Sequence, residues 1–227
     1  MSVWAHPDDE SWSAAGIMMA ARDHGQKVVC VTATRGEQGV QDEKRWPQEH
    51  LADIREQELQ KTMEIMDISS HIWLDYADGG CAQIAADSAV AKLVAIITEV
   101  RPDSILTFGP DGITGHSDHI TVGHWVGQAV AQSDPRPAVY HATISEEWYQ
   151  KVGKQWDEQF DVFFNIDPPV TVPDAEVDLR FLLTKELLAR KLAALRAQRS
   201  QTEVMFASMP LQELCDTAAQ ECFMRAR

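Results

Sequence analysis

Two short clusters of histidine and acidic residues stand out in this sequence. The first is His6-Pro7-Asp8-Asp9-Glu10, and the second is Gly115-His116-Ser117-Asp118-His119. Neutral imidazole and carboxylate are good zinc ligands, and a catalytic zinc site commonly uses three protein ligands and keeps a fourth position open. A turn containing Pro7 could aim His6 and Asp9 at one point and leave Asp8 free. The first cluster supplies two ligands at most, so a third must come from elsewhere, and the second cluster offers one.

The stretches around these clusters predict alternating strands and helices. We expect strands at 2–5, 27–33, 71–75, 104–108 and 138–142, and helices at 11–24, 47–66, 88–100 and 118–132. This alternation predicts βαβ units and a mostly parallel sheet. The fold class is therefore α/β, with a Rossmann-like sheet flanked by helices. A length of 227 residues favours a single domain over 1–227.

The last third of the chain is less regular. DVFFNI at 161–166 predicts an edge strand, and Pro168, Pro169 and Pro173 mark a loop. A long helix is expected over 178–199 and a shorter one over 210–224.

Polar clusters follow four of the expected strands. They are HPDDE, TRGEQG, DYADGG and GPDGITGHSDH, in chain order. In open α/β sheets, ligands bind beyond the carboxyl ends of the strands. We therefore expect residues that are distant in the sequence to surround one cleft.

These residues carry a family resemblance. AHPDDE after an N-terminal strand, with GHSDH roughly a hundred residues later, resembles the LmbE-like or PIG-L de-N-acetylase family. ADIREQEL, DYADGG and KLAALRAQRSQ are weaker matches, and together the matches cover most of the chain. The resemblance implies a zinc-dependent hydrolase that removes the acetyl group from an N-acetylated sugar, commonly an N-acetylglucosamine-type conjugate.

The resemblance also implies a role for each matched residue. His6, Asp9 and His119 would bind Zn2+, and Asp8 would be the general base that takes a proton from the attacking water. A protonated His116 would stabilise or protonate the reacting group, and Asp118 would orient a histidine, His116 being the expected one. Arg55 and Asp78 match positions where the family contacts substrate.

One position departs from the family pattern. Some relatives carry an aromatic residue just before the histidine of the second cluster, whereas this chain has Gly112-Ile113-Thr114-Gly115. The partner of the developing oxyanion is then Thr114, a weaker donor, or a group from another loop. This departure bears on the substrate class more than on the reaction.

Composition excludes several classes of partner. Thirty-five acidic residues against 20 basic ones give a net charge of −15, and such a surface repels nucleic acid and anionic lipid. The four cysteines lack C-x-x-C spacing, and no apolar run approaches the length of a membrane span. We expect a cytoplasmic protein acting on a small N-acetylated sugar conjugate, and the resemblance allows a homo-oligomer.

Other interpretations of the clusters stay open. Acidic strand ends also hold magnesium in phosphoesterases, although two histidines favour zinc. A dinucleotide-binding module would need a glycine-rich first turn, where this chain has HPDDES. A metal-binding protein without catalysis is a further alternative, which the free acid Asp8 disfavours. Trp12, Trp46, Trp148, Tyr149 and Trp156 lie where they could line a sugar site or simply pack within loops.

Overall fold

A single eight-stranded sheet organises the chain, and the computed structural model describes every residue from Met1 to Arg227. The strands are β1 (Ser2–Trp4), β2 (Val29–Thr34), β3 (Ser70–Tyr76), β4 (Ser104–Phe108), β5 (Ala138–Ser145), β6 (Thr171–Val172), β7 (Leu179–Leu182) and β8 (Gln220–Arg225). Their order is β3-β2-β1-β4-β5-β8-β7, with β6 paired to β5. Strands β1 to β5 are parallel, and β8 runs antiparallel to β5 and β7. The predicted α/β fold is confirmed.

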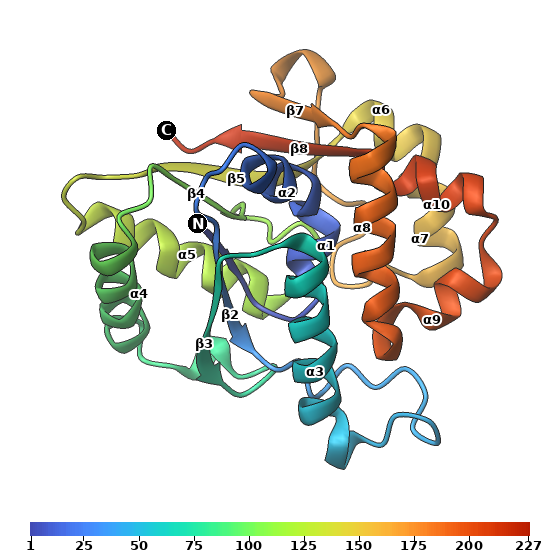
Figure 1. Cartoon of the computed structure of the whole chain (residues 1–227), viewed down its shortest axis with the longest axis horizontal. Helices are drawn as coiled ribbons and strands as arrows, with labels where there is room; N and C mark the ends of the chain where they lie inside the picture. Colours follow the sequence, from blue (N-terminus) through green and yellow to red (C-terminus); the bar gives the residue numbers. More distant parts are fainter.

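Helices cover both faces of this sheet (Figure 1). They are α1 (Asp9–Ser13), α2 (Ala15–Asp23), α3 (Gln48–Met66), α4 (Ala86–Val100), α5 (Ser117–Ala131), α6 (Glu146–Trp148), α7 (Lys154–Phe160), α8 (Lys185–Ala197), α9 (Arg199–Ser208) and α10 (Leu211–Ala218). Short 3-10 helices cover Cys81–Gln83 and Asp174–Glu176, and a π-helical turn covers Tyr149–Gly153. Helices α4 and α5 pack together on one side, whereas α8 packs against α2 and α3 on the other. None of these helices combines the length and hydropathy needed to cross a membrane.

The main core explains why the first strands could be recognised from the sequence. Strands β1 and β2 are buried along their whole length, and their apolar runs are typical of central parallel strands covered on both faces. A core of 31 buried residues joins them to the flanking helices. A second core of five buried residues joins α8 to α10.

One glycine fixes the approach of α5 to the sheet. A Cβ on Gly123 would lie 2.9 Å from the carbonyl oxygen of Phe108, at the end of β4. Because Gly123 has no side chain, α5 can pack close to β4, and the first turn of α5 carries His119. This glycine therefore helps to hold the second cluster beside the sheet.

The predicted edge strand at 161–166 is wrong, because this segment forms turns. Asp161 has φ +50, in the left-handed region, and the Asp157 carboxylate accepts a hydrogen bond from the Phe163 N–H at 2.9 Å. These local hydrogen bonds satisfy the backbone without a neighbouring strand.

Two predicted helices each contain a strand. Within 178–199, β7 comes first, and Thr184 then caps α8 by accepting a hydrogen bond from the Leu187 N–H at 3.2 Å. Within 210–224, α10 ends at Ala218 and β8 follows. Strand β8 lies between β5 and β7 and buries consecutive residues, so its short apolar run has no alternation to separate it from a helix. The predicted helix at 11–24 is likewise divided into α1 and α2 at Ala14, which has φ −147.

The strand order places the two clusters side by side. Strand β1 is followed by β2 on one side of the sheet and has β4 as its other neighbour, so the strand order reverses between β1 and β4. Ligands in such folds bind at this switch point. The first cluster follows β1 and the second follows β4.

Candidate functional site

The first cluster forms a tight turn after β1. Asp8 is the N-cap of α1 and has φ +112, an unfavourable backbone conformation for a residue other than glycine. In this turn the His6 N–H donates a hydrogen bond to Asp9 Oδ2 at 2.7 Å. Such backbone strain persists only where the surroundings enforce it, and it is often found at functional sites.

The second cluster holds His119 in a defined tautomer. His119 Nδ1 lies 3.0 Å from the carbonyl oxygen of Gly112, and its ring stacks on Phe108 with centroids 4.2 Å apart. A carbonyl can only accept, so Nδ1 carries the proton and Nε2 keeps its lone pair. The lone pair of Nε2 is then available to a metal ion.

His6 is held in the complementary tautomer by two carboxylates. Its Nε2 lies 2.9 Å from Asp78 Oδ1 and 3.4 Å from Asp118 Oδ2. Burial alone would lower the pKa of His6, but these carboxylates outweigh it and raise the pKa to about 10. The carboxylates favour a proton on Nε2, which leaves Nδ1 to accept a second cation. Carboxylates commonly orient metal-binding histidines in this way.

Three donor atoms converge on one point. His6 Nδ1 lies 3.1 Å from His119 Nε2 and 3.7 Å from Asp9 Oδ2, and His119 Nε2 lies 3.3 Å from Asp9 Oδ1. Tetrahedral ligands at 2.0–2.1 Å from zinc are about 3.3 Å from one another. Two imidazole nitrogens and a carboxylate at these separations repel one another unless they share a proton or a metal ion, and the separations fit a bound zinc ion. The sets His6, His116, His119 and His6, Asp78, Asp118 also bring ligand-type atoms within 4.8 Å of one another.

Asp78 and Asp118 face His6, which differs from the sequence-based expectation for both. Asp118 accepts hydrogen bonds from the N–H groups of Gly79 at 2.8 Å and Cys81 at 3.1 Å. Asp78 Oδ2 accepts one from the Gln38 N–H at 2.8 Å. Although burial opposes it, contact with His6 lowers the pKa of both carboxyls, so they stay charged. Both oxygens of Asp78 are engaged in this arrangement, one by His6 and one by the Gln38 N–H, and the Asp118 carboxylate faces His6 rather than His116.

Arg55 lies behind Asp8 rather than exposed in the cleft. It is 4% exposed, donates to the carbonyl oxygens of Pro7 and Gly36, and its Nη2 lies 3.3 Å from Asp8 Oδ2. Gly36 has φ +68, and a Cβ there would collide with the guanidinium. Burial raises the pKa of Asp8, while Arg55 opposes that rise. The geometry makes Arg55 a support for the Pro7–Asp8 turn.

His116 lines the site as a neutral ring. The Asp118 N–H donates to His116 Nδ1 at 3.1 Å, so the ring proton belongs on Nε2. Burial, together with the positive charge of His6, lowers the pKa of His116. The structure therefore differs from the expected protonated histidine and leaves a neutral hydrogen-bond donor. The nearby Thr114 hydroxyl lies 3.2 Å from His119 Nδ1.

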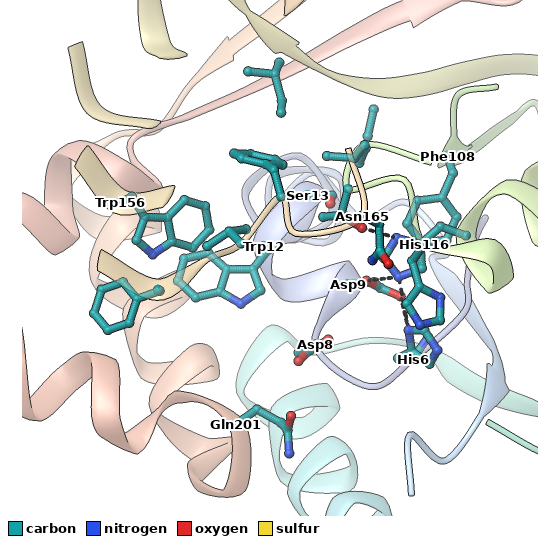
Figure 2. Close-up of a pocket in the computed structure, with 18 of the residues that line it drawn as sticks. His6, Asp8, Asp9, Trp12, Ser13, Phe108, His116, Trp156, Asn165 and Gln201 are labelled. Carbon is teal, nitrogen blue, oxygen red and sulfur yellow. Dashed lines mark hydrogen bonds and ion pairs between the residues drawn. The ribbon is translucent and has the colours of Figure 1, made fainter. Parts of the chain in front are cut away.

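These residues occupy one end of a cavity of about 580 Å³ (Figure 2). All eight residues expected at the site except Asp118 line this cavity, and Asp118 lies directly behind His6. Trp12, Trp148 and Trp156 also line it, whereas Tyr149 and Trp46 do not.

Several other lining residues carry no recognisable signal in the sequence. In the sequence, Phe108, Phe160 and Phe163 look like ordinary core positions. Only the structure shows that they also line the cavity. Gln38 and Gln201 also line the cavity. Gln38 follows the TRGE segment at the end of β2. Because the strand ends converge on one cleft, this position could have indicated that Gln38 lines the cleft.

Comparison with known proteins gives consistent results. The family model for GlcNAc-PI de-N-acetylase, PIG-L, matches residues 1–130. The chain is 31% identical to "Probable N-acetyl-alpha-D-glucosaminyl L-malate deacetylase 2" from Bacillus cereus, covering 89% of this chain and 83% of the relative. It is 29% identical to the 1D-myo-inositol 2-acetamido-2-deoxy-alpha-D-glucopyranoside deacetylase of Saccharomonospora viridis, covering 89% and 84%. The solved N,N'-diacetylchitobiose deacetylase of Pyrococcus horikoshii has a similar fold, with a TM-score of 0.70 at 20% identity over 99% of this chain and 82% of that one.

Proposed function

Because the chain belongs to the GlcNAc-PI de-N-acetylase (PIG-L) family, we propose that it is a zinc-dependent N-deacetylase acting on an N-acetylglucosamine-type conjugate. The observation that carries this proposal is the convergence of His6 Nδ1, His119 Nε2 and Asp9 beside Asp8. The products are acetate and the free amine of the sugar.

Zinc fits this donor set better than magnesium. Two imidazole nitrogens and one carboxylate match a catalytic zinc site, whereas magnesium prefers oxygen ligands in octahedral geometry. When bound, the zinc ion lowers the pKa of water towards about 7 and polarises the acetyl carbonyl. His6, Asp9 and His119 would hold it, while Asp78 and Asp118 keep His6 in the binding tautomer.

Asp8 is the proposed general base. It immediately precedes Asp9 in the turn and lines the cavity, yet it is not needed as a ligand. It takes a proton from the water that attacks the acetyl carbon and passes it to the amide nitrogen as the C–N bond breaks. Arg55 holds the Asp8 turn in place through its bonds to Pro7 and Gly36.

His116 is the proposed partner of the reacting carbonyl. The Asp118 N–H fixes Nδ1 as an acceptor, so Nε2–H can donate towards the oxygen that becomes negative. A preorganised donor of this kind lowers a barrier by roughly 3 kcal/mol. A neutral His116 performs this role without adding a positive charge beside a cation.

The phosphoesterase alternative is less well supported. Asp8, Asp9, Asp78 and Asp161 line the cavity, and its one lysine or arginine is Arg55, which is already engaged. A phosphate group would meet mainly negative charge there. A metal-binding protein without catalysis would have no use for Asp8 held in a strained backbone beside the ligands.

Several broader predictions belong to the same proposal. A cytoplasmic location is supported by four cysteines that are all free thiols. One domain over 1–227 is supported by a sheet in which β8, at the end of the chain, joins the strands of the first half. Self-association stays a prediction from the family resemblance.

The proposal is tested by measuring zinc content and acetate release together. The purified chain is stripped with a chelator, reloaded with zinc, and assayed on a panel of N-acetylglucosamine conjugates. We expect about one zinc per chain and amine release that is lost on stripping and restored on reloading. Activity that persists in the stripped protein would contradict zinc dependence, and zinc binding with no hydrolysis across the panel would favour the binding protein.

A further inference from the structure

The end of the cavity away from the metal centre is lined by apolar and aromatic side chains. We call this part the aromatic chamber and define it by Trp12, Trp148, Trp156, Phe160, Phe163 and Met205. It belongs to the same cavity as His6, Asp9 and His119, and Figure 2 shows Trp12 and Trp156 beside each other on the side opposite the histidines. A substrate whose amide lies at the metal centre could therefore extend into it.

The chamber is built from rings that hold one another. The centroids of Trp12 and Trp156 are 5.1 Å apart, and those of Trp148 and Trp156 are 6.0 Å apart in an edge-to-face arrangement. Trp148 Nε1 donates to the carbonyl oxygen of Thr217 at 3.2 Å. A preformed apolar surface of this kind binds a ligand group with little loss of side-chain entropy.

Helix α1 connects the chamber to the metal centre. Asp9 and Trp12 are three residues apart on this helix, and Lys191 holds the backbone there by donating from Nζ to the Trp12 carbonyl oxygen at 2.8 Å. The distance between the reacting amide and the chamber is thus fixed by one short helix.

The chamber has features that an ordinary core lacks. Trp12, Trp156 and Phe160 are only partly buried against the second core, and Trp156 Nε1 is buried without a hydrogen-bond partner. Phe164 and Val204, also on the cavity lining, are 66% and 58% exposed. Exposed apolar side chains that line the same cavity point to an apolar ligand group.

Charge around the cavity limits what that ligand can be. Asp161 is an acid on the lining, the Glu221 carboxylate is buried against Lys191, and the one arginine or lysine on the lining, Arg55, is held by Pro7, Gly36 and Asp8. A carboxylate or phosphate in this region would find no free cation.

We propose that the aromatic chamber binds an uncharged apolar aglycone, an aryl or alkyl group on the sugar of the deacetylated substrate. This proposal rests on the deacetylase function proposed above. The apolar group belongs to the aglycone because the acyl group removed is acetyl, which has only one methyl and needs no chamber of several rings.

The test compares glycosides of N-acetylglucosamine that differ only in the aglycone. The set is methyl, phenyl and octyl glycosides and the 1-phosphate, with the methyl glycoside of N-octanoylglucosamine as an acyl-chain arm. We expect kcat/KM to be about tenfold to a hundredfold higher for phenyl or octyl than for methyl, mainly through KM, because an apolar group of that size is removed from water. The 1-phosphate should be poorer than the methyl glycoside.

Trp156→Ala should reduce the phenyl-to-methyl ratio to within about threefold of one. Trp46→Ala is the matched control, because Trp46 packs against Arg45 and Arg199 in a neighbouring surface pocket and does not line the cavity. The ratio should not change in that control.

Equal kcat/KM for methyl and phenyl glycosides in the unmodified protein would overturn the proposal, as would a larger gain from the N-octanoyl chain than from the aglycone. If no glycoside is deacetylated, the proposed function fails. Equilibrium binding of the glycosides then tests separately whether the aromatic chamber binds an apolar aglycone. Phenyl N-acetylglucosaminide should then still bind at least tenfold more tightly than the methyl glycoside, with that difference lost in Trp156→Ala. Equal affinities would overturn the inference.

Discussion

Two buried charged clusters lie within this chain, and they are satisfied in different ways. In the first, the Lys191 ammonium donates to Glu221 Oε1 and to the Trp12 carbonyl oxygen, both at 2.8 Å. Glu221 also accepts from the N–H groups of Gly16 at 2.7 Å and Ile17 at 2.9 Å, at the start of α2. Each charge finds its partners within the chain.

The metal centre is less deeply buried, with side chains about one-tenth exposed to the cavity. His6 Nδ1, His119 Nε2 and Asp9 face one another at 3.1–3.7 Å, with the tautomer of each ring set by partners on its far side. These atoms are held together by a shared cation, which is a proton on His6 or a metal ion. The comparison shows that burial of charge does not by itself indicate function, whereas ligand-type atoms converging at the separations of a metal site do. Variants can test each half of this contrast.

The largest effect is expected at Asp8. Asp8→Asn removes the proposed base and keeps the size of the side chain, so kcat should fall by about 10³-fold or more. Zinc content and Tm should stay close to those of the unmodified protein. Asp53→Asn, on the exposed surface of α3, is the control. Loss of zinc in Asp8→Asn would make Asp8 a ligand instead.

A change in the Lys191–Glu221 cluster should lower the stability of the fold rather than the rate of the reaction. Lys191→Met leaves the Glu221 carboxylate buried without its cation, and breaking such a pair costs about 3–5 kcal/mol. We expect a Tm lower by about 8 °C or more in thermal unfolding, with zinc still bound by the folded protein.

The control for Lys191 is Lys61→Met, which removes an exposed pair with Glu64 and should cost less than about 1 kcal/mol. If Lys191→Met and Lys61→Met had the same Tm, the buried pair would not contribute as described.

A smaller effect is expected at the carboxylates behind His6. Asp78→Asn weakens the preference for a proton on Nε2, and loss of such a partner lowers metal affinity by about tenfold to a hundredfold. Zinc affinity measured against a competing chelator gives the result, with Asp75→Asn at an exposed ion pair as the control. An unchanged affinity would contradict the assignment of Asp78 to His6 and return it to substrate contact.

The smallest effect concerns His71, a half-buried histidine whose ring nitrogen pairs with the Thr32 hydroxyl at 2.9 Å. Burial lowers the pKa of His71 to about 4, whereas the carboxylates raise that of His6 to about 10. Below the usual pKa of 6.5 the unfolded chain takes up a proton that the folded chain does not. Stability from this group is therefore fully present above pH 6.5 and is lost as the pH falls towards 4.

The matching measurement is urea unfolding of the unmodified protein and His71→Gln at pH 7 and pH 5. Between these pH values the unmodified protein should lose about 1 to 2 kcal/mol more than the variant. Equal losses would show that His71 titrates normally in the folded protein.

The sequence predicted the parallel half of the fold well, for a physical reason. Strands β1, β2 and β4 are short, buried runs that end at polar clusters, and alternation with helices leaves few other arrangements. Strand β8 was missed because its buried run of 220–225 carries no alternation and follows a true helix directly. Strand β7 was missed because the Thr184 cap separates it from α8 by only two residues.

The residues that form the site could be predicted from the sequence, but not all of the contacts that each of them makes. His6 and Asp9 follow β1 directly, and His119 lies in the first turn of α5 after β4, so the order of the strands brings the two clusters to the same edge of the sheet. Which carboxylate reaches which histidine depends on loop backbone, and the N–H groups of Gly79 and Cys81 turn Asp118 towards His6. No sequence pattern encodes that direction.

The most direct test of the metal centre is zinc X-ray absorption spectroscopy on the zinc-loaded protein and on Asp8→Asn. The three converging donors predict a shell of low coordination number containing two imidazole nitrogens and at least one carboxylate oxygen, unchanged in Asp8→Asn. A six-coordinate shell made only of oxygen, or a shell that changes when Asp8 is replaced, would contradict the assignment of His6, Asp9 and His119 as the ligands.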